Sequence, residues 1–158
     1  MSTVYLALGT NLGDRLANLR AALDSFSPDI KILAESKVYE TPPWGYTDQP
    51  AFLNMAVKAE TDSDAASLLK RLKQIEVEVG REKTFHWGPR VIDIDILFYD
   101  DIIFESETLT IPHPRLHERA FVLVPLADIA SEHIHPVLKK TVGQLLDECD
   151  AGGIKLFL

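Results

Sequence analysis

The sequence predicts one α+β domain in which helices cover one face of a mixed or antiparallel β-sheet. Short apolar stretches alternate with stretches of helical periodicity in the order β-α-β-β-α-β. This order is typical of a ferredoxin-like α/β sandwich. A chain of 158 residues without repeats or linker-like segments fits a single domain, and 46% hydrophobic with 25% charged residues is an ordinary globular composition. We therefore assign residues 1–158 to one domain.

The N-terminal half contains three of the predicted strands and the first helix. Residues 3–8 form a short, apolar, β-favouring run. Apolar residues from Leu16 to Phe26 recur at helical spacing, and Asp14 is a suitable N-cap. Two further strands are expected over residues 30–40 and 52–60, on either side of a turn-rich segment at 41–50.

The C-terminal half begins with the strongest helical pattern of the chain. Apolar residues from Leu68 to Val79 form one stripe, Asp62 or Ser63 is the expected N-cap, and Gly80 suits the position after the helix. Residues 91–98 are the clearest strand. The remaining expected elements are a hairpin of residues 102–104 and 108–111, a partly helical segment over 115–129 that Pro125 interrupts, and a last helix over 141–149.

Charge and composition exclude several classes of function. The formal net charge of −8 disfavours a protein that coats nucleic acid or binds an anionic membrane. Cys149 is the only cysteine, so an intrachain disulfide is impossible, which fits a reducing compartment. No apolar run approaches the ~18 residues that span a bilayer, and no signal peptide is evident. We expect a cytoplasmic protein without nucleic-acid or membrane partners.

Two acidic residues stand in the most apolar strand. Side chains alternate along a strand, so Asp93 and Asp95 share one face, while Ile92, Ile94, Ile96 and Phe98 are expected to share the other. The two carboxylates lie ~6.6 Å apart along the strand and repel each other, unless divalent cations bind between them. Oxygen ligands favour Mg²⁺. The alternative is an edge strand whose aspartates simply face water.

Basic residues flank this acidic pair in an otherwise acidic protein. Arg81, Lys83 and Arg90 precede it, and His113 and Arg119 follow at a greater distance. Cations beside a metal-binding acid pair suit a polyphosphate, since metal and arginine together neutralise its oxygens. No phosphate-cradling glycine loop is present, so side chains and metal would have to hold a nucleotide. The alternative is a solvated charged loop, which is the simpler interpretation of Lys83 taken alone.

A second subsite is suggested by the proline turn at 41–45 and the strand that follows it. The turn fixes backbone groups, and Asn54 offers both donors and acceptors to the edge of a planar heterocycle. The aromatic residues Phe52, Trp87 and Phe121 could stack on such a ring. The alternatives are core packing for the aromatic side chains and a satisfied buried amide for Asn54.

Several motifs run in order from residue 7 to about residue 125. They are Gly9-Thr10-Asn11-Leu12-Gly13-Asp14, Tyr39-Glu40-Thr41-Pro42-Pro43, Phe52-Leu53-Asn54, Trp87-Gly88-Pro89-Arg90 with Asp93 and Asp95, and Pro112-His113-Pro114-Arg115 with Arg119-Ala120-Phe121. Together they resemble the 6-hydroxymethyl-7,8-dihydropterin pyrophosphokinase family. The block from Trp87 to Leu97 is the most specific part of this resemblance.

The resemblance implies a monomeric ferredoxin-like fold with mobile loops. It implies transfer of the β,γ-pyrophosphoryl group of ATP to the pterin hydroxymethyl group, with release of AMP, as a step of folate biosynthesis. Two Mg²⁺ ions are implied at Asp93 and Asp95, with Arg81 and Arg90 as further catalytic residues. The implied ATP-binding residues are Glu76, Lys83, Trp87, Arg90, Thr110, His113 and Arg119. The implied pterin-binding residues are Thr41, Pro42, Trp44, Gly45, Phe52, Asn54, Trp87 and Phe121.

Two other functions compete with this interpretation. A nucleotidyltransferase-like enzyme would also place paired aspartates on such a sheet, but the chain lacks the basic composition expected of a nucleic-acid enzyme. A non-catalytic binding module has no need of paired acids beside arginines. No residue stands out as a general base; metal coordination of the hydroxyl and assistance from Asp95 are both open.

Overall fold

The computed structural model describes residues 1–43, 48–80 and 91–158. The core follows the predicted order, and the ferredoxin-like α+β class is confirmed. The elements are β1 (Ser2–Thr10), α1 (Arg15–Asp24), β2 (Ile30–Glu35), β3 (Tyr39–Thr41), β4 (Phe52–Thr61), α2 (Ala65–Val79), β5 (Asp93–Tyr99), β6 (Phe104–Glu105), β7 (Thr110–Ile111), the 3₁₀ turn η1 (Leu116–Glu118), α3 (Ala120–Ala130), α4 (Val142–Asp147) and β8 (Lys155–Leu156).

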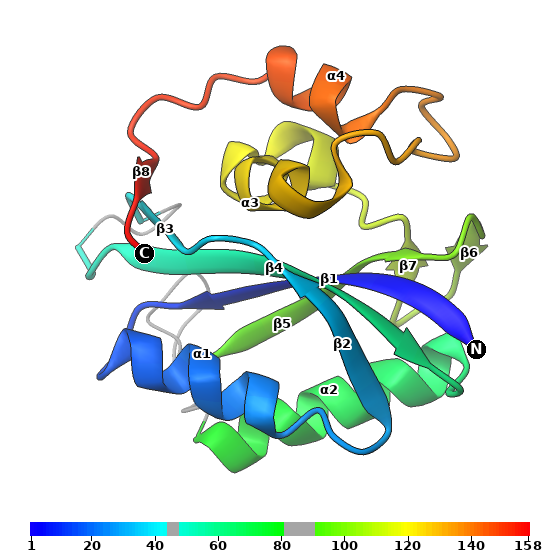
Figure 1. Cartoon of the computed structure of the whole chain (residues 1–158), viewed down its shortest axis with the longest axis horizontal. Helices are drawn as coiled ribbons and strands as arrows, with labels where there is room; N and C mark the ends of the chain where they lie inside the picture. Colours follow the sequence, from blue (N-terminus) through cyan, green and yellow to red (C-terminus); the bar gives the residue numbers. More distant parts are fainter. Residues whose placement is uncertain (44–47, 81–90) are drawn as a thin grey trace.

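One antiparallel sheet organises the molecule. Its strand order is β5-β1-β4-β3-β8, and β2 pairs with β4 as well. Helices α1 and α2 lie on one face of this sheet, and α3 and α4 lie on the other (Figure 1). The two helices of the predicted β-α-β-β-α-β unit therefore share one face as expected, and the additional helices α3 and α4 cover the other. A second apolar cluster, which includes Leu123 and Leu126 of α3, fills the opposite side of the sheet.

A β-bulge in β5 changes which residues share a face. The register between β1 and β5 shifts between Tyr5 and Leu6, so that Tyr5 pairs with Phe98 and Leu6 pairs with Ile96. Ile96 therefore packs against α1 and α2, as predicted, but Phe98 packs in the cluster on the α3 side. The predicted common face of Ile92, Ile94, Ile96 and Phe98 is wrong at Phe98. The bulge ends the regular alternation two residues after the acidic pair.

Local hydrogen bonds explain two differences from the predicted elements. The strand expected over 30–40 is two strands, because the Ser36 hydroxyl accepts the Ala56 N–H at 2.8 Å and takes the place of a backbone carbonyl. The N-cap of α2 is Asp64 rather than Asp62 or Ser63, and its carboxylate accepts the Ser67 N–H at 2.8 Å.

The C-terminal end of α2 and the course of α3 have clear physical causes. Gly80 closes α2 with a φ of 106°, a left-handed conformation that suits glycine. Helix α3 continues through Pro125 instead of being interrupted there, since buried Leu123 and Leu126 hold both sides of the proline against the sheet. No described helix is long and apolar enough to cross a bilayer.

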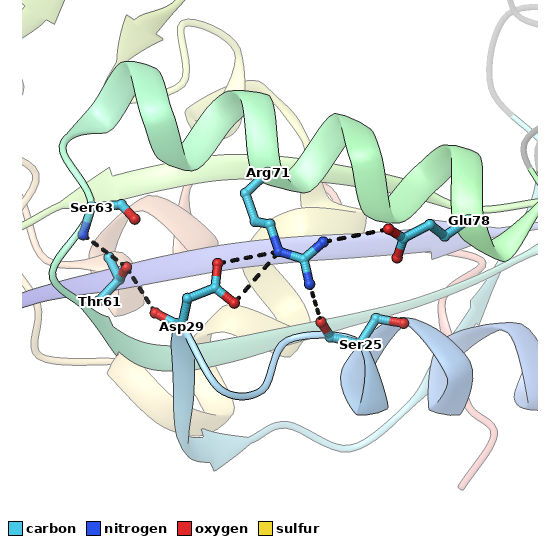
Figure 2. Close-up of polar contacts among 6 residues, drawn as sticks. All are labelled: Ser25, Asp29, Thr61, Ser63, Arg71 and Glu78. Atoms are coloured by element: carbon cyan, nitrogen blue, oxygen red, sulfur yellow. Dashed lines mark hydrogen bonds and ion pairs between the residues drawn. The ribbon is translucent and has the colours of Figure 1, made fainter.

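Arg71 on α2 forms hydrogen bonds with the end of α1 and with the residue before β2 (Figure 2). Its guanidinium donates to the Ser25 carbonyl at 2.7 Å and to the Asp29 carboxylate at 3.2 Å, and it lies 3.8 Å from Glu78. The Asp29 carbonyl in turn accepts the Thr61 hydroxyl at 3.1 Å. Arg71 therefore satisfies a backbone acceptor and a side-chain acceptor of the segment that connects α1 to β2.

We expect Arg71→Met to lower the free energy of unfolding by about 1–2 kcal/mol, because it removes charge-assisted hydrogen bonds to Ser25 and Asp29 from a mostly buried side chain. Urea denaturation of the purified variant measures this loss. Lys70→Met, at the exposed neighbouring position of the same helix, is the matched control and should change stability by less than about 0.5 kcal/mol. Equal stabilities of the two variants would contradict the role of Arg71.

Candidate active site

The acidic pair lies on β5, at one edge of the sheet. Asp93 is opposite Gly9 and Asp95 is opposite Ala7 on β1, so small residues adjoin both carboxylates on this face. Within the described part of the chain β5 pairs with β1 alone, as in the alternative of an edge strand. The aspartates nevertheless do not simply face water, because both are partly buried.

The environment of Asp95 disfavours its negative charge. Burial, and next the Asp93 carboxylate, raise the pKa of Asp95 to about 6, while Lys73 and Arg119 act in the opposite direction. The Glu76 carboxylate adds a second, weaker repulsion. Such a group of like charges is costly in the fold by itself and is relieved by a bound cation.

Glu76 approaches the acidic strand from α2, on the other face of the sheet. Its carboxylate is almost fully buried and accepts the Ile94 N–H at 2.8 Å, a backbone group on the open edge of β5. The Lys73 ammonium lies 3.4 Å from the same carboxylate. Glu76 therefore fixes the backbone of β5 through this hydrogen bond, in addition to the role at the nucleotide site that the resemblance implies.

A cavity of about 290 Å³ opens beside Asp95. Two residues implied in ATP binding, Thr110 and His113, line it together with Asp95. Lys73 also lines it, although the sequence did not single this residue out. The helical spacing of the sequence could have indicated Lys73, because it lies one turn after Leu69, which lines the same cavity. The other lining residues are Leu69, Ile96, Ser106, Glu107, Thr108, Leu109 and Pro114.

His113 is held as a neutral hydrogen-bond donor at the mouth of this cavity. Burial, and next the positive charge of Arg119, lower the pKa of His113 to about 4. Its backbone N–H donates to the Leu97 carbonyl at 3.0 Å, which fixes it to the edge of β5. Its Nδ1 accepts the Arg115 N–H at 3.2 Å, so the ring proton resides on Nε2. An Nε2–H group of this kind can donate a hydrogen bond to an anionic oxygen.

Arg119 and Phe121 lie next to each other at the start of α3. The Arg119 guanidinium carbon is 5.7 Å from the centre of the Phe121 ring. Its charge also acts on both Asp95 and His113. Phe121 is half-buried and packs against the α3-side cluster, so core packing accounts for part of its surface.

The residues of the second predicted subsite meet on the same face of the sheet. Asn54 on β4 is opposite Gly9, and Phe52 is opposite Thr41 on β3. The buried Asn54 amide donates to the Thr41 hydroxyl at 2.8 Å, as the alternative of a satisfied amide supposed. A Cβ at Gly9 would lie 2.9 Å from the side-chain oxygen of Asn54. Pro42, the residue after Thr41, is exposed.

The structure thus arranges the predicted residues along one line of the sheet. Asp93, Gly9 and Asn54 are opposite one another on three neighbouring strands, and Tyr39 is opposite Asn54 on the fourth. Thr41 lies two residues farther along that strand and accepts the Asn54 amide. Six predicted residues lie outside the described residues: Trp44, Gly45, Arg81, Lys83, Trp87 and Arg90. Nothing in the structure bears on these six.

Comparison with known protein families identifies the family of this chain. The model of the 7,8-dihydro-6-hydroxymethylpterin-pyrophosphokinase (HPPK) family matches residues 5–131 of the chain. The chain belongs to the HPPK family. The matched residues include every described position of the site, from Gly9 to Phe121.

Individual HPPK relatives agree with this assignment. A 2-amino-4-hydroxy-6-hydroxymethyldihydropteridine pyrophosphokinase of Aquifex aeolicus is 42% identical over 94% of this chain and 92% of its own length. One from Methylorubrum extorquens is 44% identical, with 98% of each chain covered. The folic acid synthesis protein FOL1 of Dictyostelium discoideum is 45% identical over 95% of this chain, which spans 23% of that protein.

A solved HPPK structure has the same fold. The HPPK-DHPS protein of Plasmodium falciparum superimposes with a TM-score of 0.73 over 94% of this chain and 43% of its own. The sequence identity is 22%, so this likeness supports the ferredoxin-like architecture only.

Proposed function

We propose that the chain transfers the β,γ-pyrophosphoryl group of ATP to the hydroxymethyl group of 6-hydroxymethyl-7,8-dihydropterin, and that AMP is the other product. Pyrophosphoryl transfer from ATP to hydroxymethyldihydropterin in folate biosynthesis is the function of the HPPK family. The observation that carries the proposal here is the position of Asp93 and Asp95, between a cavity at the β5 edge and a polar wall on β3 and β4.

The acidic pair fits Mg²⁺, and we assign two ions to it. Asp93 and Asp95 supply hard oxygen donors, and the raised pKa of Asp95 reflects burial and then repulsion by Asp93, both of which a bound cation would offset. No cluster of three or more His, Cys, Asp and Glu side chains suited to a metal occurs among residues 1–43, 48–80 and 91–158. Mg²⁺ is commonly held by one or two carboxylates together with substrate phosphates and waters. When bound, such ions polarise phosphoryl oxygens as Lewis acids.

The cavity beside Asp95 is our proposed ATP site. Thr110 and His113 line it, and the neutral ring of His113 can donate through Nε2 to a phosphate oxygen without a net charge of its own. Lys73 and Arg119 supply positive charge on two sides of Asp95. Charge of this sign stabilises the triphosphate and its transition state. By resemblance the site also includes Glu76, Lys83, Arg81, Arg90 and Trp87.

The wall formed by β3 and β4 is our proposed pterin site. Asn54 and Thr41 present an amide and a hydroxyl that already bond to each other, and such a fixed pair suits the donor and acceptor edge of a heterocycle. Phe52 on the sheet and Phe121 on α3 supply ring surfaces. This arrangement would orient the hydroxymethyl group toward the acidic pair. By resemblance the site also includes Pro42, Trp44, Gly45 and Trp87.

We further propose that the protein acts as a monomer in the cytoplasm. The support for the monomer is the family resemblance, and the support for the compartment is the single cysteine of the sequence. Sedimentation equilibrium at micromolar concentration would show the mass of one chain.

Product analysis tests the proposed reaction directly. Purified protein incubated with ATP, Mg²⁺ and 6-hydroxymethyl-7,8-dihydropterin is expected to form AMP in a one-to-one ratio with the pterin diphosphate, as measured by ion-exchange chromatography. Chelation of Mg²⁺ with EDTA should abolish the reaction. Release of pyrophosphate would favour the nucleotidyltransferase alternative, and release of ADP would exclude pyrophosphoryl transfer.

A further inference from the structure

The last residues of the chain extend the sheet beside the proposed pterin wall. Strand β8 pairs with β3, with Tyr39 opposite Leu156 and Glu40 opposite Lys155 (Figure 1). The pairing continues past β8, because the Phe157 N–H donates to the Val38 carbonyl at 2.8 Å. The sequence patterns did not predict this strand, which is only two residues long. Within the sheet, β3 is a three-residue strand that otherwise pairs with β4 alone, although the Tyr39 hydroxyl also donates to Asp128 on α3 at 2.9 Å.

Arg15, the first residue of α1, connects β8 to the same wall. Its Nη1 donates to the Glu40 carboxylate at 2.8 Å and to the Ala51 carbonyl at 3.0 Å. Its guanidinium carbon lies 5.4 Å from the centre of the Phe157 ring. One side chain therefore contacts β3, the residue before β4 and the C-terminal segment.

These contacts are made behind the wall. Side chains alternate along β3, so Glu40 lies on the face opposite to that of Thr41. Arg15 belongs to α1, which covers that opposite face. Arg15 therefore acts on the strand that carries Thr41 without itself facing the pterin site.

The turn between β3 and β4 is held at both of its described ends. Gly153 packs on Pro42 so closely that a Cβ at Gly153 would lie 3.3 Å from the Pro42 ring. The Asn11 amide donates to the Gln49 side chain at 2.9 Å and to the Pro50 carbonyl at 3.0 Å. The C-terminal segment thus contributes to one end, and the segment before α1 contributes to the other.

We propose that Arg15, together with β8, positions the pterin wall, so that Arg15 is a positioning residue for the pterin and not for ATP. This inference rests on the proposed function. The strand order β5-β1-β4-β3 places β1 between the wall on β3 and β4 and the cavity beside Asp95 at the β5 edge. Loosening β3 should therefore misplace Thr41 and its partner Asn54, while the nucleotide side of the sheet keeps its contacts.

Steady-state kinetics of Arg15→Gln test the inference. The KM for 6-hydroxymethyl-7,8-dihydropterin is expected to rise about five- to tenfold, whereas the KM for ATP should change less than about twofold. Arg15→Lys should recover part of the loss, since it keeps a charge for Glu40 but has no planar fork to reach the Ala51 carbonyl as well. Phe157→Ala should raise the pterin KM in the same direction.

Arg20→Gln is the matched control. Arg20 also lies on α1 and bonds a strand carboxylate, with 3.0 Å between its Nη2 and Glu35 on β2, but Glu35 pairs with Val57 of β4, beyond the residues of that strand that pair with β3. It should leave both KM values unchanged. Equal effects of Arg15→Gln and Arg20→Gln, or a parallel rise of both KM values in Arg15→Gln, would overturn the positioning role.

Equilibrium titration of pterin fluorescence separates this inference from the proposed function. If the wild-type protein binds the pterin and forms AMP, unchanged pterin affinity in Arg15→Gln refutes the positioning role alone. If the wild-type protein neither binds the pterin nor forms AMP, the proposed function fails and the positioning role fails with it.

Discussion

Asp95→Asn is expected to lower kcat by about a thousandfold or more and to make the protein more stable in the absence of substrate. The loss of turnover follows from the proposed role of Asp95, because an amide is a poor ligand for Mg²⁺. Asp93→Asn should lower kcat by a similar factor. The gain in stability follows from the present environment of Asp95, in which burial and Asp93 both oppose its charge.

The pH dependence of this gain has a definite sign. The pKa of Asp95 is raised from 3.8 to about 6 in the folded protein, so folding is penalised wherever the carboxylate is ionised. The penalty is fully present above about pH 6, decreases as the pH falls, and is absent below the unfolded value of 3.8. Asp95→Asn should therefore gain roughly 1–3 kcal/mol at pH 7.5 and much less at pH 4.

Urea denaturation at these two pH values, together with the AMP assay, measures both effects in one preparation. Asp101→Asn is the control, since Asp101 is an exposed acid two residues beyond the end of β5 and lines no part of the cavity. It should change neither activity nor stability appreciably. An Asp95→Asn protein that stays active, or that is less stable than the wild type at pH 7.5, would remove the basis for the metal site.

Gly9→Ala is expected to raise the KM for the pterin about ten- to a hundredfold, with little change in the KM for ATP. A Cβ at Gly9 would lie 2.9 Å from the Asn54 side-chain oxygen, closer than side chains tolerate. The amide cannot easily yield, because it is buried and bonded to Thr41 at 2.8 Å. The added methyl group should therefore displace the group proposed to recognise the heterocycle.

A double-mutant cycle distinguishes this mechanism from general damage to β1. Asn54→Ser removes the atom that the methyl group would meet. If the Asn54 amide is the target, then Gly9→Ala combined with Asn54→Ser should weaken pterin binding no more than Asn54→Ser alone. Additive losses, or a large drop in the urea midpoint of Gly9→Ala, would show that the substitution disturbs the strand itself.

Much of the architecture was predictable because it depends on local patterns. The helical stripe from Leu68 to Val79, the Asp14 cap and the strand after residue 90 all depend on spacing within one segment, and the structure confirms them. The failures concern features that depend on another segment. The Ser36 interruption depends on Ala56, the face of Phe98 depends on a bulge against β1, and β8 exists only because β3 offers it an edge.

The candidate site divides in the same way. The sequence by itself determined that two carboxylates share one face of a strand, and that an amide, aromatic rings and basic residues surround them in the chain. Only the tertiary structure decided that Lys73 lines a cavity with Asp95, that Glu76 holds the β5 backbone, and that Gly9 makes room for Asn54. The physical reason is that side-chain alternation is a property of one strand, whereas strand register, burial and charge proximity arise only when distant segments pack together.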